Sequence, residues 1–134
     1  MRFLSIYKAR ETNVPPTQDE MTKMNALIEE MTRSGKLLAT EGCLPSALGA
    51  RVRRSDGKVA VTDGPFTESK ELIAGFALLE AESKAEAIEL AKRFLAVVGE
   101  GECEIRQVYS GPDADCGGAA AANADRHAPA RSGA

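Results

Sequence analysis

The run Leu72-Ile73-Ala74-Gly75-Phe76-Ala77-Leu78-Leu79-Glu80-Ala81 is the most apolar strand-like segment of the chain. A nearly continuous apolar run of this length is typical of a strand that is buried on both faces. Gly75 interrupts the middle of the run, which indicates a bulge or a close approach of another backbone or of a ligand. We therefore expect residues 72–81 to form a central strand of a sheet.

Two helices are expected, one before and one after this strand, because each segment opens with a capping box. The two boxes are Thr17-Gln18-Asp19-Glu20 and Ser83-Lys84-Ala85-Glu86, in which a hydroxyl residue precedes a glutamate by three positions. The first helix is expected over residues 18–34 and the second ends at Gly99. Apolar residues at helical spacing predict the buried faces: Met21, Met24, Leu27, Ile28 and Met31 in the first helix, and Ala87, Ile88, Ala91, Phe94, Leu95 and Val98 in the second. The methionines fit either plain core or the wall of a ligand pocket, since thioethers adapt to irregular shapes.

The remaining strands are expected over residues 3–7, 36–42 and 102–109, and a hairpin joins residues 48–54 to 58–62. The hairpin turns at Ser55-Asp56-Gly57, where Asp-Gly favours the positive φ angles of a tight turn. Arg51 and Arg53 share one face of its first strand, either as a solvated surface or as an anion-facing site.

The order of these elements is β-α-β, a hairpin, a strand, and then α-β. Two helices can cover one face of an antiparallel sheet, while strands that are apolar on both sides need a second cover. We therefore predict an α+β, ferredoxin-like two-layer sandwich that pairs into a dimeric α/β barrel, that is, a homodimer.

Composition narrows the function classes. The chain has 134 residues and a net charge of −3, so we expect a single domain with no general attraction to nucleic acid or to an anionic membrane. No apolar run approaches the roughly 20 residues that span a bilayer, and the start of the chain lacks the pattern of a signal peptide. A cytoplasmic location is expected.

The cysteines and the histidine suggest no catalytic or metal centre. Cys43, Cys103 and Cys116 are widely spaced, so we expect small buried or half-buried residues and one tail thiol rather than disulfides or a zinc site. The one histidine, His127, lies in an alanine- and glycine-rich tail, so a Ser-His-Asp or Cys-His mechanism is not expected. We predict a folded domain over residues 1–110 and a disordered low-complexity tail over 111–134.

The stretch Asp63-Gly64-Pro65-Phe66-Thr67-Glu68-Ser69-Lys70-Glu71 carries the densest potential chemistry. Gly-Pro makes a rigid turn and Phe66 can anchor it by burial. Lys70 between Glu68 and Glu71 predicts a structural ion-pair cluster. Alternatively, Asp63 and Glu71 could act as a general base and its partner if burial raises the pKa of one of them. The three carboxylates lack a histidine or a calcium-loop spacing, so we expect no metal and no cofactor.

This stretch resembles the signature of the YCII-related proteins, in the branch named for its DGPF motif. All nine positions of Asp63–Glu71 match, and flanking similarities include residues 3–7, 34–37, 42–45, 53–58, 75–76 and 105–106. The resemblance covers about residues 1–110 and implies a dimeric α+β barrel with a cleft near the dimer interface. Members of the wider superfamily carry a His-Asp pair in that cleft, and one branch includes a dehydrochlorinase. The position of that histidine corresponds to Met24 here, so the base of the pair is absent.

The resemblance also implies a link to extracytoplasmic-function sigma factors, beside which proteins of the DGPF branch are often encoded. We therefore predict a dimeric ligand-binding or regulatory protein, with a sigma factor as a possible partner. Its ligand-binding residues would be Met24, Asp63, Phe66 and Lys70. The alternative is a small-molecule lyase or hydrolase-like enzyme that uses Asp63 and neighbouring carboxylates, Glu71 first among them.

Overall fold

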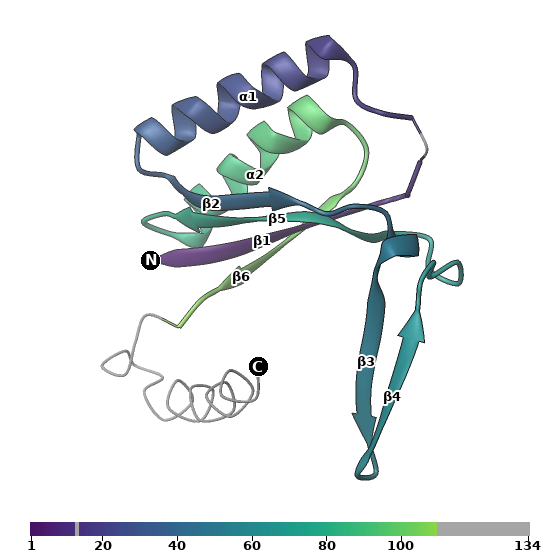
Figure 1. Cartoon of the computed structure of the whole chain (residues 1–134). Helices are drawn as coiled ribbons and strands as arrows, with labels where there is room; N and C mark the ends of the chain where they lie inside the picture. The colour runs from purple at the N-terminus through teal and green to yellow at the C-terminus, as the bar shows by residue number, and fades with distance from the viewer. Residues whose placement is uncertain (13, 110–134) are drawn as a thin grey trace.

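The computed structural model describes residues 1–12 and 14–109, which form one four-stranded sheet, a separate hairpin and two long helices (Figure 1). Both expected helices and all the expected strands are present, with ends that differ by a few residues. In chain order the elements are β1 (Arg2–Ala9), α1 (Gln18–Arg33), β2 (Leu37–Gly42), the short 3₁₀ helix η1 (Ser46–Leu48), β3 (Ala50–Ser55), β4 (Lys58–Asp63), β5 (Leu72–Glu80), α2 (Lys84–Val98) and β6 (Glu102–Gln107).

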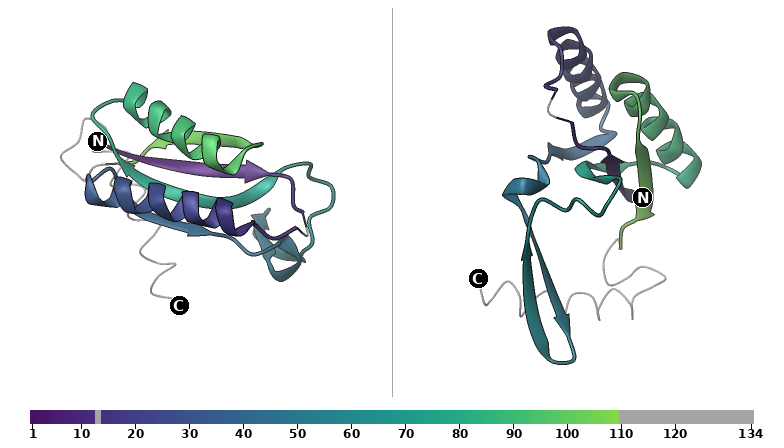
Figure 2. Two further views of the ribbon diagram at one scale, coloured as in Figure 1. Left: turned by 90° about the horizontal axis from the view of Figure 1, so that it is seen from above. Right: turned by 90° about the vertical axis from the view of Figure 1, so that its right-hand side faces the viewer.

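The main sheet is antiparallel and its strand order is β2-β5-β1-β6. This is the ferredoxin-like arrangement that was predicted, and β5 lies inside the sheet between β1 and β2. Both helices lie on the same face of the sheet, as the view from above shows (Figure 2, left). The α+β, ferredoxin-like fold is therefore confirmed, whereas the dimeric barrel stays a prediction.

The helix starts follow the sequence signals, one of them with a change of partner. The Thr17 hydroxyl accepts from the Glu20 N–H at 3.1 Å, and the Glu20 carboxylate accepts from the Thr17 N–H at 3.2 Å, which completes the first capping box. At the second start the Ser83 hydroxyl accepts from the Glu86 N–H. The Glu86 carboxylate, however, accepts from the Glu82 N–H and from Lys36 Nζ, both at 3.0 Å. The second box is thus only half formed, and Glu86 instead ties α2 to the start of β2.

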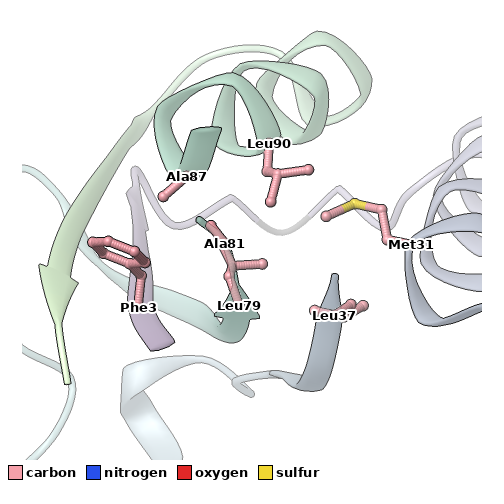
Figure 3. Close-up of a cluster of buried hydrophobic side chains, with 7 residues drawn as sticks. All are labelled: Phe3, Met31, Leu37, Leu79, Ala81, Ala87 and Leu90. Atoms are coloured by element: carbon pink, nitrogen blue, oxygen red, sulfur yellow. The ribbon is translucent and has the colours of Figure 1, made fainter. Parts of the chain in front are cut away.

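The hydrophobic core lies between the helices and the sheet (Figure 3). Each fully buried leucine or phenylalanine there contributes about 1.5–3 kcal/mol to the free energy of unfolding. The prediction that Ile88 and Met21 belong to the core is wrong, because Ile88 is 38% exposed and Met21 is 46% exposed. The buried residues of α2 are Ala87, Leu90 and Ala91, which lie three and four positions apart and therefore on one side of the helix. Leu90 thus points into the core in place of Ile88. The core members are Phe3, Met31, Leu37, Leu79, Ala81, Ala87 and Leu90.

The face of the sheet opposite the helices, called the open face below, is covered by no element of the described chain (Figure 1). Strand alternation places one set of apolar side chains on it: Leu4, Ile6, Ile73, Phe76 and Leu78. Ile73 is 57% exposed and Phe76 is 38% exposed. Lys8 and Glu104 form an ion pair at 2.8 Å on the same face. The open face is therefore a mixed surface with an apolar centre.

The β3–β4 hairpin extends from the sheet on the side away from the helices (Figure 1; Figure 2, right). Its turn has positive φ angles at Asp56 (51°) and Gly57 (76°), as predicted from the sequence. Every residue of both strands is exposed, and Arg51 and Arg53 lie on one face. A two-stranded hairpin is only marginally stable by itself in water, so contacts at its base must help to hold it.

The described cysteines are unpaired: Cys103 is half-buried as expected, but Cys43 is exposed, since it lies beyond the last residue of β2. Cys116, His127 and the tail fall outside the described residues. None of the helices in the described ranges is both long enough and apolar enough to cross a membrane.

Candidate functional site

A cavity of about 290 Å³ lies between the two helices and the sheet face that they cover; we call it the interlayer cavity. Its volume is at the lower end of the range for small-molecule sites, and most of its wall is apolar, as in such sites. The sheet contributes β1, β2 and β5, and the helices contribute the methionine face of α1 and one turn of α2. The lining residues are Ser5, Tyr7, Met24, Leu27, Ile28, Met31, Leu37, Thr40, Glu41, Gly42, Ala74, Gly75, Phe76, Ala77, Leu79, Leu90, Ala91 and Phe94.

Two glycines that line this cavity face each other across β2 and β5. Gly42 of β2 pairs directly with Gly75 of β5, so neither strand places a side chain there. A Cβ atom on Gly75 would lie 2.8 Å from the Glu41 carbonyl oxygen, which explains why this position requires glycine. A Cβ atom on Gly42 would meet nothing nearer than the Ala74 carbonyl oxygen at 4.0 Å. Gly42 thus borders open space that a larger residue would fill.

The polar groups of the interlayer cavity are few and mostly neutral. The Thr40 hydroxyl donates to the Phe76 carbonyl at 2.9 Å, and Ser5 is buried. Among the lining residues Glu41 is the one with a formal charge at neutral pH. The described part of the wall therefore offers hydroxyl oxygens to a ligand but no cation.

Tyr7 is fixed by two contacts at this site. Its hydroxyl donates to the Glu100 carbonyl at 2.5 Å, and its ring meets Phe94 edge to face with centroids 5.1 Å apart. Burial raises the pKa of Tyr7 above its usual value, and the nearby Cys103 and Glu71 raise it further. Tyr7 is thus a neutral phenol at physiological pH and joins β1 to the loop that follows α2.

A second cavity, the loop pocket, has a volume of about 300 Å³ and is formed by the Asp63–Glu71 stretch together with η1 and the two residues that follow β1. Arg51 lies over the Phe66 ring at 3.9 Å and pairs with the Glu68 carboxylate, which fixes the outer side of the loop. The lining residues are Arg10, Glu11, Ser46, Pro65, Phe66, Thr67, Ser69, Lys70 and Leu72.

The structure does not bring the four predicted ligand-binding residues together. Met24 lines the interlayer cavity, whereas Phe66 and Lys70 line the loop pocket. Asp63 and Glu71, the candidate catalytic pair, are both exposed and line neither cavity. The roles given to these five residues stay predictions.

The predicted ion-pair cluster around Lys70 is not observed. Glu68 pairs with Arg51 of the hairpin instead, and its pKa is lowered by its own backbone N–H and by the Arg51 guanidinium. Sequence reasoning also did not identify Ser5, Tyr7 and Thr40 as part of a site. The period-two alternation of strands places Ser5 and Tyr7 on the face of β1 that also carries core residues, and this pattern could have identified them.

Comparison with known proteins identifies a domain family. The profile of the YCII-related domain matches residues 1–111. An uncharacterized protein of Rhizobium meliloti (strain 1021) is 35% identical over 72 residues, which is 54% of this chain. The match spans 58% of the length of that relative.

Solved structures resemble the chain more distantly. The 5-chloro-2-hydroxyhydroquinone dehydrochlorinase TftG of Burkholderia phenoliruptrix AC1100, in complex with 2,5-dihydroxybenzoquinone, has a TM-score of 0.47 and 19% identity. That alignment covers 86% of this chain and 100% of the other. CutA of Xylella fastidiosa has a TM-score of 0.38 and 13% identity, and 82% and 86% of the two chains are covered. Because both TM-scores lie below 0.5, nothing about ligand or activity is carried over from these proteins.

Proposed function

Because the chain belongs to the YCII-related domain family over residues 1–111, we propose that this domain binds a small molecule in the interlayer cavity. The observation that carries the proposal is the cavity itself, which is preformed and apolar, with hydroxyl groups at its wall. Gly42 supports it further, since a Cβ atom at this lining position would meet nothing nearer than 4.0 Å.

The lining restricts the chemistry of the ligand. No lysine or arginine of residues 1–12 and 14–109 lines the cavity, so an anion would be buried without a counter-charge from these residues, which is costly. Met24, Met31 and Phe94 favour an apolar or aromatic body, and the Ser5 and Thr40 hydroxyls can bond one polar substituent. We therefore propose a neutral, compact ligand, such as a ring that bears a hydroxyl or carbonyl group.

The methionines allow a direct test. In protein labelled with ¹³C-methyl methionine, Met24 and Met31 report on the cavity, whereas Met1 and Met21 do not line it and serve as internal controls. Titration with phenol, 4-methylphenol and hydroquinone should shift the Met24 and Met31 methyl signals in a saturable manner and leave the other two unchanged. Equal shifts at all four methyls, or none at Met24 and Met31, would refute the proposal.

A matched pair of variants links any binding to the cavity. Gly42→Val places a side chain in the open space and should weaken binding by roughly tenfold or more. Gly49→Val introduces the same side chain at a position that lines neither cavity and has an extended φ of −111°. A Cβ atom there meets the Ser46 carbonyl oxygen at 3.5 Å, an ordinary contact, so binding should not change.

We further propose that the protein is a homodimer through its open face. Exposed Ile73 and Phe76 beside half-buried Leu78 support this, since apolar patches of this kind mark association surfaces. Ile73→Glu should convert the dimer to a monomer in sedimentation equilibrium. Ile88→Glu makes the same change on an exposed part of α2 and should leave the mass unchanged. A wild-type monomer would contradict the proposal.

A regulatory role with an extracytoplasmic-function sigma factor is a proposal from the resemblance of Asp63–Glu71 to the DGPF motif. It is supported by the exposure of Asp63 at the base of the hairpin, where a partner can reach it. Co-purification with an extracytoplasmic-function sigma factor would test it, with Asp63→Ala as the variant expected to bind less. No retention of the sigma factor by the wild type would exclude that partner.

The enzymatic alternative has less support. Asp63 and Glu71 are exposed to solvent, and neither lines a cavity that would hold a substrate.

A further inference from the structure

The loop pocket has a different chemical character from the interlayer cavity. Two cationic side chains line it, Arg10, which directly follows β1, and Lys70 from the segment before β5. Hydroxyl groups of Ser46, Thr67 and Ser69 lie in the same wall. Arginine, lysine and hydroxyl groups are the usual donors to carboxylate and phosphate oxygens. The pocket therefore combines the donor groups that an oxyanion requires.

The wall of this pocket is held by hydrogen bonds rather than left as a loose loop. The Ser46 N–H donates to both oxygens of the Glu11 carboxylate at 3.0 and 3.2 Å, and the Phe66 N–H donates to Ser46 Oγ at 3.2 Å. Gly64 packs so closely that a Cβ atom would lie 1.6 Å from the Ser46 carbonyl oxygen. The lining of η1 and of the loop is thus fixed before any ligand arrives, which lowers the entropy cost of binding.

The charges of the pocket do not cancel within the protein. Within residues 1–12 and 14–109, neither Arg10 nor Lys70 forms an ion pair, whereas Lys8 and Arg51 each have a carboxylate partner. Glu11 is the one acidic residue of the wall, and its carboxylate already accepts the Ser46 N–H. The lining therefore carries a net positive charge, with two cations against one carboxylate.

We propose that the loop pocket binds the oxyanion group of a small metabolite, a carboxylate or a phosphate, through Arg10 and Lys70. Phe66, Pro65 and Leu72 provide an apolar surface for the body of the ligand. This site is separate from the interlayer cavity and does not depend on the function proposed for it. In this proposal Lys70 and Phe66 bind a ligand of their own, which differs from the ligand that Met24 would contact.

Amide NMR titration of the full chain with sodium phosphate and, separately, with sodium benzoate tests the proposal, with sodium chloride at matched ionic strength as the reference. The Thr67 and Ser69 amides should shift in a saturable manner, whereas those of Asp56 and Gly57 at the hairpin turn should not. Saturation by phosphate alone assigns a phosphate group, and saturation by benzoate alone assigns a carboxylate. Saturation by neither anion overturns the proposal.

Charge variants make the test specific. Lys70→Gln and Arg10→Gln should each weaken binding about five- to tenfold, because a charged hydrogen bond is lost at an exposed site. Glu11→Gln should strengthen it, since the opposing charge is removed while the amide oxygen can still accept the Ser46 N–H. Lys58→Gln removes a cation outside the pocket and is the matched control. An equal loss in Lys58→Gln and Lys70→Gln would show general charge attraction and overturn the assignment.

Discussion

Gly75 and Gly42 are direct register partners, yet alanine at these two positions should have opposite effects on stability. A Cβ atom on Gly75 would lie 2.8 Å from the Glu41 carbonyl oxygen and 3.3 Å from Gly42 Cα, and both contacts are to backbone. Neighbouring strands cannot yield as a flexible side chain can, so β2 would have to shift. Such overpacking costs about 1–3 kcal/mol, against which the lower entropy of the unfolded chain returns about 0.4–1 kcal/mol. We expect Gly75→Ala to lower the free energy of unfolding by roughly 1–2 kcal/mol.

Gly42→Ala is the matched control. The added methyl group meets nothing nearer than 4.0 Å, so the unfolded-chain effect acts alone and should stabilise the protein by about 0.4–1 kcal/mol. Urea unfolding followed by circular dichroism at 25 °C measures both changes. For a domain of this size about 1 kcal/mol corresponds to a Tm change of roughly 4–8 °C, so thermal unfolding gives a second reading. If Gly75→Ala were as stable as Gly42→Ala, the close approach of β2 to β5 would be refuted.

Three further predictions concern the core, acid stability and the loop. Leu79→Ala should cost about 2–5 kcal/mol in urea unfolding because Leu79 is 2% exposed, whereas Leu44→Ala, at a 77% exposed residue, should stay within about 0.5 kcal/mol of wild type. The pKa of Glu86 is lowered in the folded protein by its hydrogen bonds to a backbone N–H and a lysine. The ionised carboxylate therefore adds to the free energy of unfolding above the unfolded-state pKa of about 4.3. This added stability is lost as the pH falls through the lower pKa of the folded state. The stability gap between wild type and Glu86→Gln should therefore narrow from pH 6 to pH 3, and a constant gap would contradict this. Arg51→Ala removes the cation–π contact with Phe66, which is worth about 0.5–1 kcal/mol. Amide hydrogen exchange in residues 66–69 should therefore become faster. Unchanged exchange would show that Arg51 does not hold the loop.

Local signals in the sequence predicted the local structure well. The apolar run 72–81, the capping box at Thr17 and the Asp56-Gly57 turn each act over a few residues, and each feature is present in the structure. The side of α2 that faces the core was harder to predict, since Ile88 and Leu90 are both apolar. Contacts with the sheet decide which of the two residues is buried. Periodicity indicates an apolar face but does not fix its centre when apolar residues lie next to one another.

The sites were harder to predict because each joins segments that are distant in the sequence. Glu68 pairs with Arg51 rather than with Lys70 because the hairpin places Arg51 next to the loop. The spacing of Glu68, Lys70 and Glu71 in the sequence does not reveal this contact. Met24 was predicted as a ligand residue and lines a cavity, but the hydroxyls that face it come from β1 and β2. A sequence reports which residues can bind, whereas the packing of strands decides which of them share a wall.

The position of β1 has a consequence for the synthesis of the protein. β1 precedes the other strands of this domain in the chain, yet it pairs with β5 and with β6, and its register with β6 places Phe3 opposite Gln107. On the ribosome β1 must therefore stay unpaired until β5 has emerged, and its second edge stays unpaired until β6 follows. Closing such long loops is slow, and the waiting strand is a target for chaperones or for aggregation. A truncated nascent chain that ends before β6 should remain sensitive to protease, and resistance should arise abruptly once β6 clears the exit tunnel.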